Sequence, residues 1–451
     1  MIKRKSDRIA YHLFLASAAV LVFSCGVVFE KCQIFPVQLY TLAKDGYDQI
    51  SGWSRKRGAK SYFIRSRNPH RPVIFNSPEA HEGLNFVTRI AADGQISVII
   101  LDLDGARLHE WKIDWFEIWP DASHVPDHLI PLSRPGTHAH GAVLLENGDL
   151  IFNFEHLGLV CLDLHGGVLW RLPYQTHHSV TRSSDGNLWV CGQKEYSKPH
   201  KQFPNWIPPF TEDTLLEVTA QGKIVNEWSV VDLLLKNGLE GLLFIGSREN
   251  NSTKATGDVL HLNDVEPFPS HFEEGFFKKD DVMVSLRNIN TIFVFNRESG
   301  KIKFIRTGDF LRQHDPDFID GDTFSVFDNR LAAGIAQSRI LIVSAKDQTV
   351  NTYYQGTRHN PFYTNIMGKH QWLPNGNLLI TESRNGRAFE IDKNGKIVWE
   401  YNNYVSDGVV GLMEEVTRLP TAFAPLFKNP KANRQVSHLP NRPTAKDSKG
   451  G

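Results

Sequence analysis

The chain has 451 residues, of which 41% are hydrophobic and 11% aromatic, and these values are typical of a globular protein with a large core. Its 50 basic and 50 acidic residues balance, which argues against a general nucleic-acid binder and against wholesale disorder. A mean hydropathy of -0.31 excludes a multi-span membrane protein. Four cysteines without a CxxC pair argue against a disulfide scaffold and a structural zinc site.

The first predicted element is an apolar segment at residues 9–29 that contains no Asp, Glu, Lys or Arg. A helix of about 20 apolar residues spans a bilayer. Residues 1–8 are basic, so the N-terminus is expected to stay cytoplasmic while the rest crosses. We expect a transmembrane signal anchor on a single-pass membrane protein, with the body outside the cytoplasm and periplasmic in a bacterium. A cleaved signal peptide and a lipoprotein stay open as alternatives, and both would also export the body.

The zero net charge hides an uneven distribution along the chain. Residues 1–10 sum to +3 and residues 428–451 to +5, which leaves -8 for the body between them. The basic tail at 428–451 has little apolar content, and we expect it to be disordered. Residues 30–83 are expected to be a connecting segment rather than a domain.

The body at 84–427 repeats a short phrase in which a turn and a few apolar residues precede an aromatic residue. The copies are LDLDGARLHEW (101–111), LDLHGGVLW (162–170), VTAQGKIVNEW (218–228), FNRESGKIKF (295–304), VSAKDQTVNTYY (343–354) and IDKNGKIVW (391–399). Asp/Asn-Gly turns between apolar runs mark β-hairpins. Six units of about four strands each predict an all-β fold, a six-bladed β-propeller. Insertions are expected at 196–213 and at 230–257, the second with a short helix.

Histidines recur at one position of this repeat. They stand shortly before the turn glycine or at the opening of the unit, and they are His140, His178, His261, His314 and His370. The first strand of each blade lines the channel of a propeller, so the sequence predicts that these units direct a histidine, or a near neighbour, to one mouth. Imidazole suits nucleophilic or acid–base chemistry near neutral pH. Only His138–His140 and His177–His178 are close pairs, so we expect no metal.

Two further features leave alternatives open. Arg287 lies in an otherwise apolar strand, where it either pairs with a buried carboxylate such as Asp264 or Asp315, or faces an anionic ligand. Cys161 and Cys191 either form a disulfide in an oxidising compartment or remain two buried thiols.

Several motifs in order resemble the arylsulfotransferase family, exported propeller enzymes that use aryl sulfates instead of a nucleotide sulfate donor. The resemblance covers roughly 84–420 and rests on THHSVTRSSDGN, LHLNDVEPFP, SLRNINTIFVFNRESGKI, RQHDPDF with VFDN, and GKHQWLPNGNLLITES followed by EIDKNGKIVWEY. It implies that a sulfuryl group moves from an aryl sulfate to a phenolic or other hydroxyl acceptor through a sulfo-histidine. Both partners are then small molecules, and no cofactor is required. The homo-oligomeric state stays open.

The resemblance also assigns roles to individual residues. His314, in the QHD motif, would attack the sulfur, and Arg287 would neutralise the sulfuryl oxygens. Four more residues would bind the substrate or assist the leaving phenol: His261, Asn263, His178 and, as an alternative to it, His177. His370 and Thr381, from the last blade, complete the predicted substrate-binding set. Asp315 would orient His314 if its side chain turned inward.

Two other function classes compete with the transferase. One is a propeller that binds sulfated or anionic glycans without turnover, and the other is a different propeller enzyme, a quinoprotein or a lyase. The chain has no C/S-x-P-x-R sequence, which disfavours a sulfatase, and no G-x-x-x-x-G-K loop, which disfavours a nucleotide-dependent sulfotransferase.

Overall fold

The structure is a computed structural model and describes residues 12, 14–25, 58–67, 73–200, 205–245, 255–331 and 337–428. The chain divides into two compact units, Met1–Lys56 and Arg57–Gly451. In the first unit residues 14–25 are helical. No helix within the described ranges is both long enough and apolar enough to cross a membrane. Residue 12 is described as well, and the remaining residues of the predicted anchor, together with the predicted tail beyond Lys428, lie outside the described residues.

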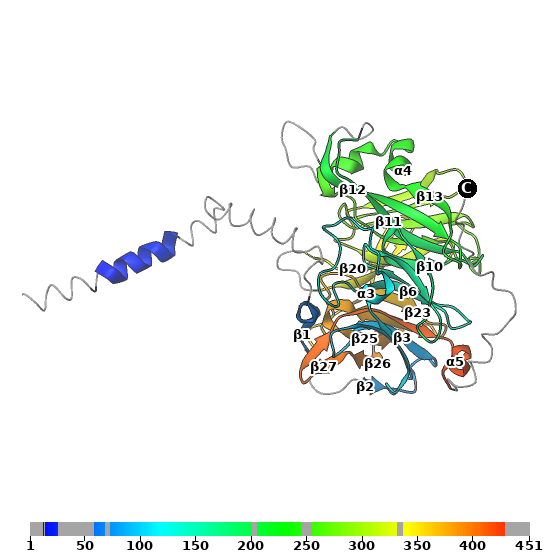
Figure 1. The fold of residues 1–451 in the computed structure, drawn as a ribbon, viewed down its shortest axis with the longest axis horizontal. Coiled ribbons are helices and arrows are strands. Elements are labelled where there is room, and N and C mark those ends of the chain that lie inside the picture. Colours follow the sequence, from blue (N-terminus) through cyan, green and yellow to red (C-terminus); the bar gives the residue numbers. More distant parts are fainter. Residues whose placement is uncertain are drawn as a thin grey trace, which may run out of the picture. The chain divides into compact units, whose positions relative to one another are not determined.

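The second unit is built on six antiparallel sheets, each with a core of four consecutively paired strands (Figure 1). The first sheet comprises β29 (Met413–Leu419), β3 (Leu84–Ile90), β4 (Ile96–Leu101) and β5 (Arg107–Ile113). The second comprises β6 (Ala139–Leu144), β7 (Leu150–Phe154), β8 (Gly158–Leu162) and β9 (Val168–Leu172). The third comprises β10 (Gln175–Arg182), β11 (Leu188–Tyr196), β12 (Trp206–Val218) and β13 (Ile224–Ser229). The fourth sheet comprises β15 (Leu262–Pro267), β16 (Asp281–Leu286), β17 (Thr291–Asn296) and β18 (Ile302–Thr307). The fifth comprises β19 (His314–Phe318), β20 (Thr323–Asp328), β21 (Arg339–Ser344) and β22 (Thr349–Gln355). The sixth comprises β23 (Lys369–Trp372), β24 (Leu378–Glu382), β25 (Arg387–Ile391) and β26 (Ile397–Asn402).

The six sheets close into a propeller-like ring. The first strand of each sheet contacts the first strand of the next, in the order β29, β6, β10, β15, β19, β23 and back to β29. The last strand of the chain, β29, pairs with β3, so the first sheet joins both ends of this unit. The turn glycines Gly148, Gly186 and Gly376 have φ of 89°, 88° and 83°, a conformation that glycine adopts without strain. The hairpin turns predicted from the repeat are therefore present.

Smaller elements surround these sheets. Among the strands, β1 (Phe63–Arg65), β27 (Tyr404–Ser406) and β28 (Val409–Gly411) form a separate sheet, β2 (Val73–Asn76) extends the last sheet beside β26, and β14 (Ala255–Asp258) runs parallel to β12. The helical elements are α3 (Trp115–Ile118), α4 (Val230–Lys236), α5 (Ala424–Lys428) and the 3-10 turns η1 (Ala59–Tyr62), η2 (Glu240–Phe244), η3 (Ser383–Asn385) and η4 (Thr421–Phe423).

The insertions take specific forms. The 230–257 insertion does contain the predicted short helix, α4, which lies against β12 and β13 (Figure 1). Much of the 196–213 insertion instead lengthens the β11–β12 hairpin, whose pairing reaches Tyr196 and Phe210. The predicted connecting segment also contributes strands β1 and β2, because its short apolar runs pair with sheet edges that would otherwise be open.

The hydrophobic core lies between neighbouring sheets. Trp189 of β11, for example, is fully buried in a cluster with Phe293 and Phe295 of β17. The thiols of Cys161 and Cys191 are buried and free, which settles the alternative left open by the sequence. Burial raises the pKa of Cys161 to about 12, so this thiol is an inert part of the core.

Candidate functional site

Irregularities in the inner strands direct side chains toward the centre of the ring. The register shifts within the first strand of five of the six sheets, at Ala139–Ala142, His177–Val180, Leu262–Asp264, His314–Asp317 and Met413–Glu415. Such bulges re-aim side chains and are frequent beside functional sites. His178 and Asp315 accordingly have positive φ of 53° and 48°, conformations that are strained for residues other than glycine.

Four of the five recurring histidines converge in space. The ring centroid of His178 lies 4.1 Å from that of His140, 4.9 Å from that of His261 and 6.3 Å from that of His314. A narrow cavity is lined by His140, His178 and His314 together with Asn263. The predicted convergence of these four histidines is therefore present, and three of them line the cavity.

The imidazole of His314 has a defined tautomer. Its Nδ1 lies 2.7 Å from Oδ1 of Asn329, whose Nδ2 donates to the carbonyls of Thr364 and Met367. The Asn329 oxygen must therefore accept, so Nδ1 of His314 carries the hydrogen and Nε2 has a free lone pair. Burial, reinforced by the charge of Arg287, lowers the pKa of His314 to about 3. The ring is neutral at neutral pH, the state that a nucleophile needs.

Arg287 places a positive charge beside His261, and burial together with this charge lowers the pKa of His261. The backbone N–H of Arg287 donates to the carbonyl of His261 at 2.9 Å. The Nδ1 of His261 is hydrogen-bonded to Asp258. Burial raises the pKa of Asp258, but the charges of His261 and Arg287 outweigh burial and hold that pKa well below its ordinary value. Asp258, rather than Asp264 or Asp315, is thus the carboxylate that balances Arg287.

Several buried polar atoms of this cluster lack a hydrogen-bond partner within the described part of the chain. They are Nε of Arg287, Nε2 of His261 and Oδ1 of Asn263. Leaving a buried polar group unsatisfied costs about 1–3 kcal/mol. Such groups collected at one place indicate a site that a polar ligand completes.

His178 and His177 occupy different positions. His178 lines the cavity, whereas His177 stacks beside His156 with ring centroids 4.9 Å apart. The two Nδ1 atoms lie 2.8 Å apart and share a hydrogen bond. Burial, and then the charge of His140, lowers the pKa of His178. His178 is therefore the member of the pair that faces the cavity, and His177 lies behind it with its Nδ1 in hydrogen-bond contact.

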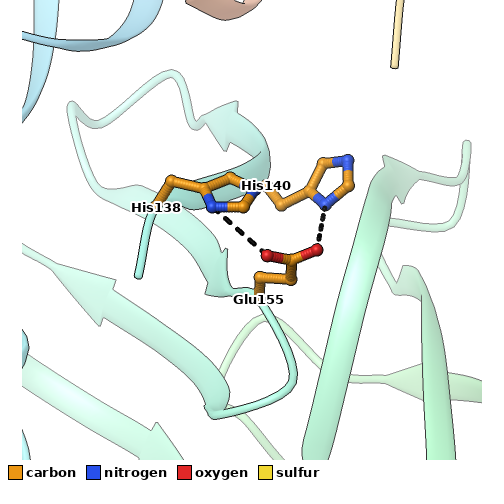
Figure 2. Close-up of side chains that lie close together, drawn as sticks. All are labelled: His138, His140 and Glu155. Carbon is orange, nitrogen blue, oxygen red and sulfur yellow. Dashed lines mark ion pairs between the residues drawn. The ribbon is translucent and has the colours of Figure 1, made fainter. Parts of the chain in front are cut away.

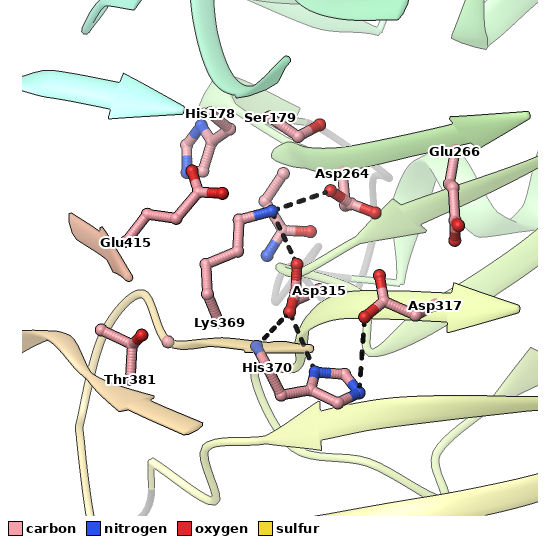
Figure 3. Close-up of polar contacts among 12 residues, drawn as sticks. His178, Ser179, Asp264, Glu266, Asp315, Asp317, Lys369, His370, Thr381 and Glu415 are labelled. Carbon is pink, nitrogen blue, oxygen red and sulfur yellow. Dashed lines mark hydrogen bonds and ion pairs between the residues drawn. The ribbon is translucent and has the colours of Figure 1, made fainter. Parts of the chain in front are cut away.

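Below the histidines lies a layer of buried charge (Figure 3). The Nζ of Lys369 lies 2.6 Å from Oδ1 of Asp315 and 3.6 Å from Oδ1 of Asp264. Burial raises the pKa of Asp315, but Lys369 and then His370 outweigh burial and lower it to about 2. Burial raises the pKa of Asp264 to about 6. Asp315 therefore belongs to the Lys369 network and does not orient His314.

His370 and Thr381 are not part of the histidine cluster. His370 is fixed between two partners. Asp315 lies 2.9 Å from its Nδ1 (Figure 3), and Ser325 lies 2.7 Å from its Nε2. Thr381 is buried, and its hydroxyl accepts the backbone N–H of Val416. The substrate-binding prediction for these two residues is not supported by their placement, because their polar atoms are committed to neighbouring strands.

A second, wider cavity also adjoins the Lys369 layer. Its volume is about 430 Å³, and Asp315, Lys369 and Glu415 line both it and the narrow cavity. His370 faces this second cavity. The residues around Lys369 thus border two cavities.

A second group of residues lies beside the cavity. His138 and His140 approach Glu155 (Figure 2), and both also approach Glu414 of β29. His140 and Glu414 line the narrow cavity. Burial, and then the charge of His138, lowers the pKa of His140 well below its ordinary value.

Four residues at or beside this site were not predicted from the sequence: Asn329, Asp258, Glu155 and Glu414. Asn329 ends the VFDN motif and Asp258 stands three residues before His261, so both carried a local signal. Glu414 carried none, because it reaches the site only through the pairing of β29 with β3.

The fold and the site define an all-β, propeller-like protein with a buried histidine–arginine cluster at its centre. The model of the arylsulfotransferase (ASST) family matches residues 141–404, more than half of the chain. The chain belongs to the arylsulfotransferase family, and membership indicates a transferase that acts on small molecules.

Comparison with solved structures gives only distant likenesses. A protein of unknown function from Bacteroides caccae is 13% identical with a TM-score of 0.45, over 74% of this chain and 98% of that chain. Virginiamycin B lyase from Staphylococcus aureus is 14% identical with a TM-score of 0.33, over 59% and 70%. The Cps50 (Swd1) β-propeller domain of Myceliophteria thermophila is 9% identical with a TM-score of 0.41, over 76% and 90%. These scores are too low to carry an argument. No curated protein matches the chain at a significant level.

Proposed function

We propose that this protein transfers a sulfuryl group from an aryl sulfate to a hydroxyl acceptor, and that its six sheets are the blades of a six-bladed β-propeller. The observation that carries the proposal is the state of His314. Its ring is neutral, its Nδ1 hydrogen is held by Asn329, and its Nε2 is left with a lone pair beside a cavity. A protein that only binds an anion needs no such nucleophile.

In the first half-reaction Nε2 of His314 attacks the sulfur of the aryl sulfate. The N–S bond forms as the S–O bond to the aryl oxygen breaks, and the phenolate leaves with the electron pair. Arg287 and His178 are assigned as the preorganised donors to the charge that develops on the sulfuryl oxygens, whereas Nδ2 of Asn263 already donates to the carbonyl of Gln313. The product is sulfo-His314 and a phenol once a proton reaches the leaving oxygen.

In the second half-reaction an acceptor hydroxyl attacks the same sulfur. Its proton passes to a base as the N–S bond breaks, which regenerates neutral His314. His261 is assigned this role, because Asp258 holds its Nδ1 and leaves Nε2 without a partner among the described residues. By microscopic reversibility the same imidazole delivers the proton to the leaving phenolate in the first half-reaction.

The test is release of 4-nitrophenol from 4-nitrophenyl sulfate in the presence of an added phenol. Wild type should show turnover that depends on the acceptor, and His314→Ala should show none. His165→Ala, in an exposed turn, is the matched control and should keep full activity. Mass spectrometry of the quenched donor complex should find one sulfuryl adduct on the peptide containing His314. Unimpaired turnover in His314→Ala, or an adduct on another residue, overturns the assignment.

We also propose that residues 9–29 anchor the protein in a membrane, with the body on the extracytoplasmic side. The support is their composition and the basic residues before them. Carbonate extraction of membranes from expressing cells tests this proposal. The full chain should stay in the pellet, and a variant lacking residues 1–29 should move to the supernatant.

A further inference from the structure

Two histidines and one glutamate converge beside the narrow cavity and have no part in the chemistry proposed above. His138 Nδ1 lies 3.2 Å from Glu155 Oε2, and His140 Nδ1 lies 4.0 Å from Glu155 Oε1 (Figure 2). One ligand atom from each of the three residues lies within 4.8 Å of the other two. Ligand atoms on a tetrahedral zinc ion, at about 2.0–2.1 Å from the metal, are roughly 3.3 Å apart. Small side-chain adjustments therefore suffice to bring all three onto one ion.

The opposite nitrogens of both rings face a second carboxylate. His138 Nε2 lies 3.3 Å from Oε1 of Glu414, and His140 Nε2 lies 3.7 Å from Oε2. Glu414 is buried, with 4% of its surface exposed. A metal-bound histidine commonly gives its other N–H to a carboxylate, which fixes the ring and makes the ligand nitrogen more basic. Glu414 is placed to do this for both histidines at once.

The second cluster of histidine and carboxylates in the described ranges has a different character. There both nitrogens of His370 are hydrogen-bonded, to Asp315 and Ser325, and the Lys369 ammonium already supplies a cation at 2.6 Å from Asp315. In the first cluster, Nδ1 of His140 is buried and makes no hydrogen bond within the described part of the chain. The first cluster therefore offers a lone pair for a cation, and the second does not.

We propose that His138, His140 and Glu155 bind one divalent transition-metal ion, with Zn²⁺ preferred, and that Glu414 orients the two imidazoles. Two histidines and one carboxylate are a ligand set of zinc sites that keep a fourth position open for water. Histidine spacing alone did not predict this ligand set, because Glu155 follows β7 and does not lie on β6 with His140. The ion would lie beside the cavity of His314, because His140 and Glu414 line that cavity.

The experiment uses the full chain, stripped with EDTA and exchanged into metal-free buffer. Zn²⁺ is titrated by calorimetry, and bound metal is counted by elemental analysis after gel filtration. Wild type should bind one Zn²⁺ per chain, and Co²⁺ should give visible absorption bands of a four-coordinate ion without thiolate charge transfer. Glu155→Gln should weaken Zn²⁺ binding by at least about 100-fold, and Glu414→Gln by about 10- to 100-fold. Asp317→Asn, the same change in the other cluster, should bind as wild type does.

Thermal unfolding separates metal loss from misfolding. Zn²⁺ should raise the Tm of wild type, since a ligand that binds only the folded state stabilises it. Glu155→Gln should unfold cooperatively in EDTA and show no rise with Zn²⁺. His314→Ala should still bind one Zn²⁺ while losing transfer, so this proposal and the proposed function fail independently. Absence of stoichiometric Zn²⁺ in wild type, or equal affinity in Glu155→Gln, overturns the metal site.

Discussion

Nδ1 of His314 donates to Oδ1 of Asn329 at 2.7 Å, whereas the residue next to it in the chain, Asp315, bonds to Lys369. A neutral amide in this position fixes the tautomer without adding negative charge. The ring therefore keeps a low pKa and a free Nε2, while a carboxylate partner would favour its protonation. This relationship between two residues underlies the first three predictions.

Asn329→Ala should slow formation of the sulfo-histidine by about 10- to 100-fold, because the ring loses the partner that fixes its orientation. The KM for donor should change little, since Asn329 does not face the substrate. Pre-steady-state release of 4-nitrophenol measures the step. Asn329→Asp should restore much of the rate and move the acid limb of the pH profile upward. A wild-type burst rate in Asn329→Ala contradicts the orienting role.

With 4-nitrophenyl sulfate, whose stable phenolate leaves without needing a proton from His261, the first half-reaction should depend little on pH between 7 and about 5. Only neutral His314 attacks, so the rate falls as pH drops through the pKa of this group, which is about 3. An ordinary histidine, with a pKa of about 6.5, would be almost wholly protonated at pH 5. Stopped-flow pH jumps from neutral stock measure the profile, and return to pH 7 checks that the protein stays folded. An acid limb centred near 6.5 would refute a neutral, buried nucleophile.

His314 should also shape the pH dependence of stability. Between the unfolded pKa of about 6.5 and the folded pKa of about 3, the unfolded chain binds a proton that the folded chain does not. His314 thus lowers the free energy of unfolding, by about 1.4 kcal/mol per pH unit, as pH falls through this window. His314→Gln should remove that share of the slope between pH 6 and 4. Urea unfolding at several pH values measures it, with His165→Gln, in an exposed turn, as the substitution control.

Arg287→Ala should reduce kcat/KM for aryl sulfate by about 100- to 1,000-fold, because the charge on the sulfuryl oxygens loses its main donor. Arg287→Lys should recover part of the loss, since lysine keeps the charge but not the planar fork. Inhibition by inorganic sulfate should weaken in parallel. Arg107→Ala, which removes an exposed arginine paired with Glu110, serves as the control. Unchanged sulfate inhibition in Arg287→Ala would rule out direct contact with the anion.

Lys369→Met should lower the free energy of unfolding by about 3–5 kcal/mol, because it leaves the buried carboxylates of Asp315 and Asp264 without a cation. The double variant Lys369→Met/Asp315→Asn should recover most of that loss. Chemical denaturation at neutral pH measures both. If the double variant is as unstable as the single one, the loss comes from packing rather than from unpaired charge.

The sequence by itself determined the repeating hairpins and placed each recurring histidine on, or directly before, the first strand of its unit. Turn glycines and alternating apolar residues act locally, so their pattern is visible without the fold. It also identified His314, His178, His261 and Arg287, which the structure brings together.

The tertiary structure alone decided which polar groups meet. Register shifts in the inner strands turn His314 and Asp315 to different partners, although they are neighbours in the chain. Closure of the ring by β29 brings Glu414 to His138 and His140 from the far end of the sequence. These contacts join residues on separate sheets, and such pairings depend on ring geometry that no local pattern records.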